Sequence, residues 1–213
     1  MTIENTDVED PLKSLEDICV PDSRHSSFSI ALEDIHRVLS EITLHSRVPM
    51  DVRQLFETAK NVSLYSWYVY RFHQVAELVG YSALEMALKE RYRIENPDKK
   101  SPTLRGLLKY AQSERWITNE GFSDRLSRAR RYAETEKTFE AIEQMKETGE
   151  SERMVDDPTE EEILNALEKI DIVGGIVSST ANLRNDLAHG SKTLHPQSIS
   201  TLRTISEVIN QVF

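Results

Sequence analysis

The sequence contains little cysteine, glycine and proline, and each scarcity excludes a class of protein. Its 213 residues include one cysteine, seven glycines and seven prolines. A lone cysteine cannot form an internal disulfide, and with scattered histidines it offers no structural zinc site. So few glycines and prolines cannot supply the many tight turns of a β-sandwich or barrel. Long helices remain, and we expect an all-α protein.

Long apolar runs are missing as well. The longest run, residues 64–72, is interrupted by serine and arginine, whereas a helix that crosses a bilayer needs about 20 apolar residues. Residues 1–10 are acidic and polar, which is not the pattern of a signal peptide. We therefore expect a cytoplasmic protein with no membrane segment.

Charge is distributed unevenly along the chain. The formal net charge is -10, which taken alone argues against a nucleic-acid partner, because phosphates bind lysine and arginine. Residues 81–131, however, carry 12 basic and 7 acidic side chains, whereas residues 132–170 carry 4 and 13. The basic segment ends in four arginines that form a candidate RNA-binding patch: Arg125, Arg128, Arg130 and Arg131. The alternative is that they pair with Glu134, Glu136 and their neighbours along the same helix.

The periodicity of apolar residues divides the chain into two regions. Residues 1–28 have no sustained period, so they are interpreted as a disordered acidic arm. Residues 29–213 are predicted to form a single helical domain with a flexible loop at 148–157. Apolar residues recur at three- and four-residue steps in this domain, which predicts about six helices over 29–45, 49–93, 101–114, 122–146, 157–189 and 196–213.

Two of these segments, 49–93 and 157–189, are predicted as long core helices. Gly80 is expected to kink the first, and Gly174-Gly175 to mark a bend or a point of close approach in the second. The run Asp157-Pro158-Thr159-Glu160 has the order of a capping box at the start of the second helix, and Gly190 is a typical C-terminal end. Ser101-Pro102 predicts the start of a shorter helix between them.

Polar side chains are concentrated near the end of segment 157–189. Asn185 and His189 are four residues apart and share a helix face, while Arg184 and His189 are separated by about 140° around the helix. Two leucines in the same turn can anchor it to the core. The sequence therefore predicts a rigidly supported polar site here, with Asp186 beside it.

This pattern is similar to the Arg-x4-His motif of the HEPN superfamily. Members of that superfamily are all-helical and carry the motif near the end of a late core helix, often with asparagine directly after the arginine. Arg184, Asn185 and His189 match the motif, and one further predicted helix follows it. The segments 83–88, 107–108 and 116–117 fit the rest of the helical core. The resemblance implies a HEPN-like helical bundle.

The resemblance also implies a chemistry, namely metal-independent RNA cleavage of a defence or toxin type that needs no cofactor. In catalytic members the ribose 2′-hydroxyl attacks its own 3′-phosphate and leaves a cyclic phosphate. His189 would act as acid or base, Arg184 would hold phosphate oxygens, and Asn185 would orient the imidazole or contact the phosphate. A homodimer would supply the second histidine by bringing two motifs together.

Other interpretations of these residues stay open. The motif can be simple capping of a helix end, with Arg184 paired to Asp186 or to Glu85. Glu85 has small and apolar neighbours, and it is also a candidate supporting residue that points toward the motif. The alternative function is a non-catalytic HEPN-like module that binds nucleotide, RNA or a partner protein, for instance as an antitoxin or accessory subunit.

Aromatic and histidine residues give a third interpretation. The aromatic stripe that contains Tyr68 and Phe72 is typical of a core or dimer interface, and it can also make the protein a helical interaction scaffold. His195 precedes a proline, and it is a candidate to reach from its loop into the cleft formed around the Arg184 and His189 motif. The other helical histidines, His36, His45 and His73, are interpreted as surface or core residues.

Overall fold

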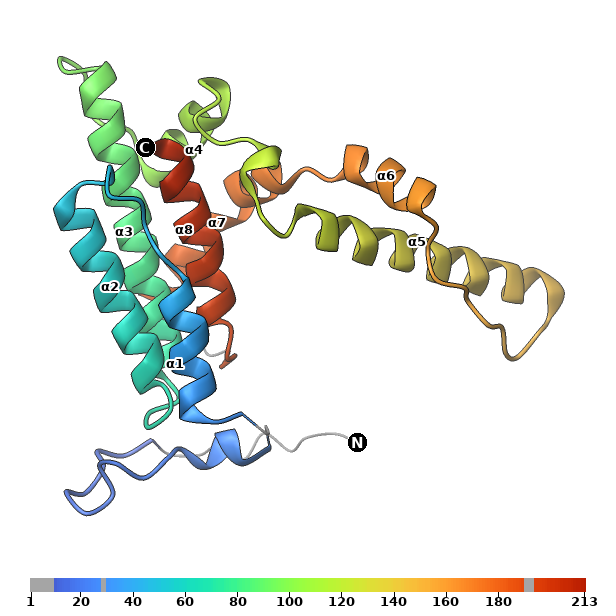
Figure 1. Cartoon of the computed structure of the whole chain (residues 1–213), viewed down its shortest axis with the longest axis horizontal. Helices are drawn as coiled ribbons and strands as arrows, with labels where there is room; N and C mark the ends of the chain where they lie inside the picture. Colours follow the sequence, from blue (N-terminus) through green and yellow to red (C-terminus); the bar gives the residue numbers. More distant parts are fainter. Residues whose placement is uncertain (1–9, 28–29, 190–193) are drawn as a thin grey trace.

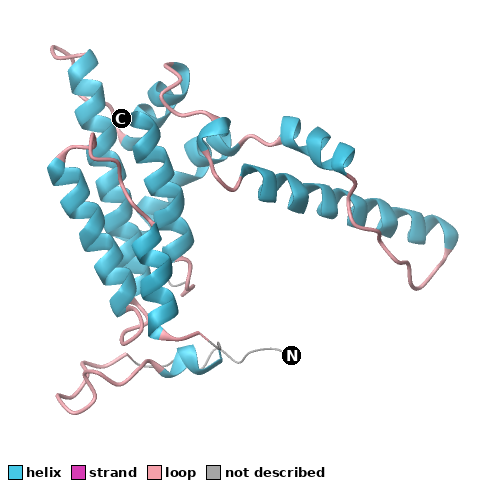
Figure 2. Cartoon of the chain, viewed as in Figure 1, coloured by secondary structure: helices cyan, strands magenta, loops and turns pink. Residues whose placement is uncertain are grey.

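The computed structural model is a helical bundle from which a two-helix arm projects (Figure 1). It describes residues 10–27, 30–189 and 194–213. These ranges contain eight α-helices, two short 3-10 helices and no strand (Figure 2). The predicted all-α class is confirmed, and the larger number of helices arises because each predicted long helix is divided in two.

The helices fall into two groups. The bundle consists of α1 (Leu32–Glu41), α2 (Met50–Tyr65), α3 (Phe72–Glu95), α4 (Leu104–Ser113), α7 (Ile172–Ala188) and α8 (Ser198–Val212). The arm consists of α5 (Arg125–Thr148) and α6 (Glu160–Lys169). The 3-10 helices are η1 (Ser23–Ser27) and η2 (Asn119–Gly121).

Helix α3 lies at the centre of the bundle, where it packs against α2, α4, α7 and α8. Its apolar residues Leu84 and Leu88 are fully buried, as are Phe56 of α2, Leu107 of α4 and Leu202 of α8. Burial of such side chains contributes about 1.5–3 kcal/mol each to folding. Helix α7 joins this core through Ile172, Val173 and Val177 in its first half. Leu183, one of the two leucines predicted to anchor the motif, is 46% exposed.

The segment 49–93 is not one long helix, because the chain turns back between α2 and α3 at residues 66–71. The N-terminal segment holds this turn: the Asp22 amide donates to the Trp67 carbonyl at 2.9 Å, and the Asp22 carboxylate accepts from the Tyr70 amide at 3.2 Å. Helix α3 continues through Gly80. A Cβ there would lie 2.7 Å from Leu202 Cδ2, so glycine allows α3 and α8 to approach closely.

The segment 157–189 is also two helices, α6 and α7. The break lies at Ile170 and Asp171, where the Asp171 carboxylate accepts a hydrogen bond from the Gly174 amide at 2.8 Å and caps α7. The break thus lies just before Gly174-Gly175, where the sequence predicts a bend or a close approach. The capping box of α6 lies two residues later than predicted and joins Thr159 to Glu162.

Other helix ends differ slightly from the predicted ones. The N-cap of α4 is Thr103, whose hydroxyl accepts from the Gly106 amide, two residues after the predicted Ser101. Helix α5 is capped at its C-terminal end by Gly149, which has a φ of 76°, a left-handed conformation that favours glycine. Gly190, the predicted end of the motif helix, lies outside the described residues.

The N-terminal segment has more contacts than the sequence predicted. His25 stacks on Trp67 with ring centroids 5.2 Å apart, and Arg24 forms an ion pair with Asp22. Residues 1–28 had been expected to lack a fold of their own. For the described residues 10–27 the structure differs, because these contacts dock the segment on the turn between α2 and α3.

The buried residues of the arm form a small cluster of their own, and Ile170 packs against both this cluster and the core of the bundle. Ala129 and Ala133 of α5 pack against Ile163 and Ala166 of α6. At its base, the Asn119 side chain donates to the Ile170 carbonyl and accepts from the Val173 amide. In the described part of the chain no helix is both long and apolar enough to span a membrane.

Candidate functional site

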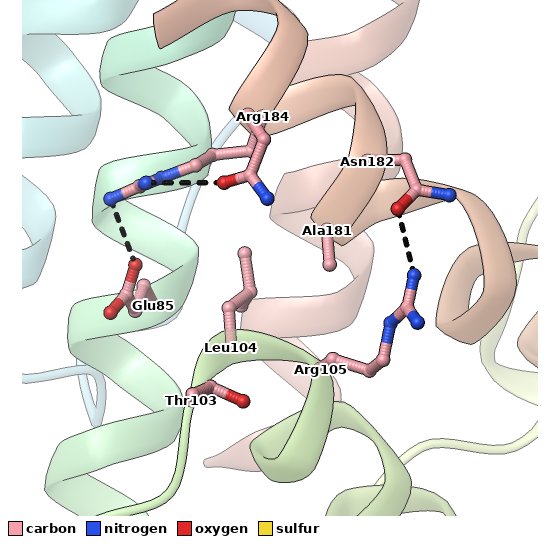
Figure 3. Close-up of a pocket in the computed structure, with 8 residues that line it drawn as sticks. Glu85, Thr103, Leu104, Arg105, Ala181, Asn182 and Arg184 are labelled. Carbon is pink, nitrogen blue, oxygen red and sulfur yellow. Dashed lines mark hydrogen bonds and ion pairs between the residues drawn. The ribbon is translucent and has the colours of Figure 1, made fainter.

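The second half of α7 forms one wall of an open groove of about 520 Å³. The other walls are α3 and the start of α4. Figure 3 shows Arg184 at one end of the groove, Arg105 at the other, and Leu104 and Ala181 between them. The lining residues are Glu85, Thr103, Leu104, Arg105, Ala181, Asn182, Arg184 and Asn185. We call this hollow the motif groove.

Arg184 makes only long contacts in the motif groove. Its Nη2 lies 3.5 Å from Oε2 of Glu85, and its Nη1 lies 3.4 Å from Oδ1 of Asn185. Its Nε is buried and has no hydrogen-bond partner among the described residues. Since charge-assisted hydrogen bonds are usually about 2.7–2.9 Å long, the guanidinium keeps most of its capacity to bind an anion.

Glu85 is shared between two cations. Its Oε1 lies 2.6 Å from Nζ of Lys89, one turn further along α3, while Oε2 faces Arg184. Glu85 was expected as a partner of Arg184, and the structure places the two in contact. The alternative pairing of Arg184 with Asp186 is not seen among the described residues, and Asp186 is exposed.

Sequence reasoning missed the other end of the groove. Arg105 Nη2 donates to Oδ1 of Asn182 at 2.7 Å, and no acidic partner of Arg105 is seen in the described ranges. Asn182 precedes Asn185 by three residues on the same helix face, so its position was a usable signal. Arg105 carried no such signal, because only the packing of α4 on α7 brings it to the motif.

His189 is the C-cap of α7, and its amide donates to the Asn185 carbonyl at 2.9 Å. Its side chain is exposed. Helical geometry places it on the face that carries Asn185 and Asn182, one turn further on. In the described chain the lining of the motif groove includes Arg184 and Asn185 but not His189.

The four arginines of the predicted RNA-binding patch lie at the start of the arm, and none of them lines the motif groove. Arg128 lines a different hollow, beside Thr180 and Leu183 of α7. Arg125 pairs with Glu120, and Arg128 contacts both carboxylate oxygens of Asp124 at 2.8 Å. Arg130 and Arg131 are exposed. The alternative pairing of this cluster with Glu134 and Glu136 is not seen in the described residues, where Glu136 binds Lys169 instead.

A separate cluster of polar groups is buried where α2, α3 and α8 meet. Nδ1 of His73 lies 2.7 Å from the Ser198 hydroxyl, which lies 2.6 Å from the Ser63 hydroxyl. Desolvation, with repulsion from His25 and His195, lowers the pKa of His73 to about 4. His73 is thus a neutral core residue.

His195 approaches this cluster. Its Nδ1 lies 3.9 Å from a carboxylate oxygen of the buried Glu77, which also accepts a hydrogen bond from Thr201. Burial raises the pKa of Glu77. His195, a candidate for the cleft, does not line the motif groove in the described chain.

No group of three or more histidine, cysteine, aspartate or glutamate residues in the described ranges is arranged to hold a metal ion. The side chains of the motif groove offer guanidinium and amide groups that bind an anion, next to an exposed imidazole.

Comparisons with models of protein families, with curated proteins and with solved structures found no match to this chain.

Proposed function

We propose that the protein is a metal-independent endoribonuclease with a HEPN-like fold, and that it acts as a homodimer. The observation that carries this proposal is the combination of Arg184, with a buried Nε that has no partner in the described chain, and the exposed His189 at the end of the same helix. A fixed cation and a nearby imidazole are the groups that phosphodiester cleavage by a ribose hydroxyl needs.

The proposed reaction assigns a role to each residue. The 2′-oxygen forms a bond to phosphorus as it loses its proton to a base, and the bond from phosphorus to the 5′-oxygen breaks as an acid protonates that oxygen. His189 serves as one of these groups. Arg184 stabilises the charge that builds on the phosphate oxygens, and Asn185 contacts the same phosphate.

The homodimer follows from the need for two proton-transfer groups. One described motif contains a single imidazole, so a second His189 from a partner chain would complete the pair. The face of α7 that carries Asn182, Asn185 and His189 is exposed, so it is open to a two-fold contact.

The test uses purified wild-type protein and two variants, His189→Ala and Arg184→Ala, with an end-labelled structured RNA in EDTA. We expect the wild type to leave cyclic-phosphate ends. Because general acid or base catalysis contributes about 10²–10⁴-fold, each variant should be slower by at least about 100-fold. His36→Ala is the matched control, since His36 is exposed on α1.

Two results would contradict the proposal. The first is cleavage by the wild type that survives in His189→Ala. The second is no cleavage of any RNA offered, when light scattering and circular dichroism show a folded dimer.

A second candidate is a non-catalytic module that binds RNA, nucleotide or a partner protein as an accessory or neutralising subunit. The observation that favours it is the absence of His189 from the described lining of the motif groove, which leaves Arg184 and Arg105 as anion-binding groups. In that case Arg184→Ala weakens binding, whereas His189→Ala has no effect on binding and no cleavage is found.

A further inference from the structure

A second hollow of about 380 Å³ adjoins the motif groove. The two share Glu85 and Arg184 in their walls. The second hollow runs along α3 and is also lined by Ser82, Met86, Lys89, Glu90, Arg93 and Ser101. Together they form one open channel, with Arg93 near one end, Arg184 in the middle and Arg105 at the other end.

The channel has an excess of positive charge, in contrast to the whole chain. Its four cations are Lys89, Arg93, Arg105 and Arg184, and its acids are Glu85 and Glu90. Glu90 lies 2.8 Å from Arg93, but the side chains are 40% and 66% exposed, so water weakens this pair and a ligand can displace it. The channel is therefore a local anion-binding surface on a protein of net charge -10.

The two cations on α3, Lys89 and Arg93, lie on the same face of the helix. Lys89 and Arg93 follow Glu85 at four-residue steps, so each lies about 6 Å beyond the last along one helix face. Arg184 of α7 and Arg105 of α4 line the adjoining motif groove (Figure 3). A row of cations along an open channel matches a chain of phosphates better than a single anion.

We propose that this channel binds the backbone of single-stranded nucleic acid. Lys89 and Arg93 contact phosphates on one side of Arg184, and Arg105 contacts a phosphate on the other side. The inference deepens the proposed nuclease function and depends on it for the position of the scissile phosphate. The described lining offers charged groups and no aromatic side chain on which a base could stack, so the proposed contacts are to the phosphate backbone.

The test measures binding without cleavage. The probe is a fluorescein-labelled 2′-O-methyl oligouridine of about 12 nucleotides, within the usual site size for single strands, which has no 2′-hydroxyl to attack. Its anisotropy is followed in EDTA over a series of salt concentrations. We expect Lys89→Ala/Arg93→Ala to bind about tenfold more weakly at about 0.1 M salt, and the slope of log K against log salt to fall by about 1.4, or 0.7 for each lost contact.

Two further double variants make the test specific. Arg37→Ala/Arg153→Ala is the matched control, because both arginines are exposed and each pairs with an acid three residues away, as Arg93 does. It should bind as the wild type does. Arg130→Ala/Arg131→Ala tests the arm, and a loss of binding there, without loss in Lys89→Ala/Arg93→Ala, overturns the proposal.

The remaining outcomes separate this inference from the proposed activity. Equal binding by Lys89→Ala/Arg93→Ala and wild type, or no binding by wild type at low salt, overturns the channel whether or not RNA is cleaved. Loss of binding in Lys89→Ala/Arg93→Ala, together with no RNA cleavage by wild type, supports the channel and contradicts the nuclease.

Discussion

Arg184 and Arg24 show how differently two arginines of one chain are used. Arg24 is held by Asp22 at 2.7 and 2.8 Å through two nitrogens, a fork that fixes the side chain and leaves little for a ligand. The contacts of Arg184, at 3.4 and 3.5 Å, orient the guanidinium without satisfying it. Arg24 therefore has a structural role, whereas the guanidinium of Arg184 can still bind an anion.

His73 gives a prediction about stability and pH. Its pKa is about 4 in the folded chain, compared with 6.5 for an ordinary histidine, so as the pH falls below 6.5 the unfolded chain takes up a proton that the folded chain does not. The free energy of unfolding should therefore decrease as the pH is lowered. Between pH 7 and pH 5 the loss is about 2 kcal/mol, at about 1.4 kcal/mol for each unit below 6.5.

Urea denaturation of wild type and His73→Asn over this pH range measures the effect. Asparagine can keep a hydrogen bond to Ser198 but has no proton to gain, so its stability should depend less on pH. The raised pKa of Glu77 acts in the opposite direction in both proteins, and the difference between them isolates His73. Equal pH dependence in the two would show that His73 is not the responsible group.

The sequence located part of the candidate site and could not locate the rest. Arg184, Asn185 and His189 lie within one helix, so their relative positions follow from helical geometry. Arg105 and Lys89 belong to other helices. Nothing in their local sequence says which helix they face, and only the packing of α3 and α4 against α7 places them there.

At the scale of helices, the main feature is that two predicted long helices are each interrupted at a position with no proline or glycine. Both predicted long helices have an unbroken apolar period, yet each is divided. The turn after Tyr65 is held by Asp22, more than 40 residues away, with Asp22 and Tyr70 in direct contact. The break at Asp171 is local, because a carboxylate that caps a helix start competes with continuation of the helix before it.

Removal of the Asp171 cap should destabilise the protein measurably. We expect Asp171→Ala to lower the free energy of unfolding by about 1 kcal/mol, since the Gly174 amide loses its acceptor. Asp171→Ser restores an acceptor and should recover most of the loss. Urea titration followed by circular dichroism measures both, and equal stability of the alanine and serine variants would show that the cap contributes nothing.

The two breaks differ in whether the local sequence predicts them. Asp171 directly before the apolar residues Ile172 and Val173 is an N-cap signal that sequence alone contains. The turn at residues 66–71 has no comparable signal, because it depends on a contact with the N-terminal segment. Apolar periodicity predicted the all-α class well and the continuity of the helices poorly.

At the scale of the whole molecule, bundle and arm are two packing units on one chain. The buried residues of the arm form a cluster of their own, and Asn119 holds its two ends together at the bundle. The arm can therefore be removed without opening the main core.

We expect a chain in which residues 126–168 are replaced by a glycine-serine linker of about six residues to fold. Its melting temperature should fall by less than about 4 °C, which corresponds to about 1 kcal/mol for a chain of this size. Circular dichroism should show loss of the arm's helical signal alone. A variant that unfolds at room temperature would show that the bundle depends on the arm.

The projecting arm also has a hydrodynamic consequence. A compact chain of this length has a radius of gyration of about 17 Å, and a particle with an arm that stands clear of the bundle (Figure 1) exceeds this value and experiences greater frictional drag. The monomer will therefore elute from a sizing column ahead of globular standards of equal mass. Light scattering and sedimentation equilibrium measure molar mass independently of shape, so they distinguish a monomer from a dimer.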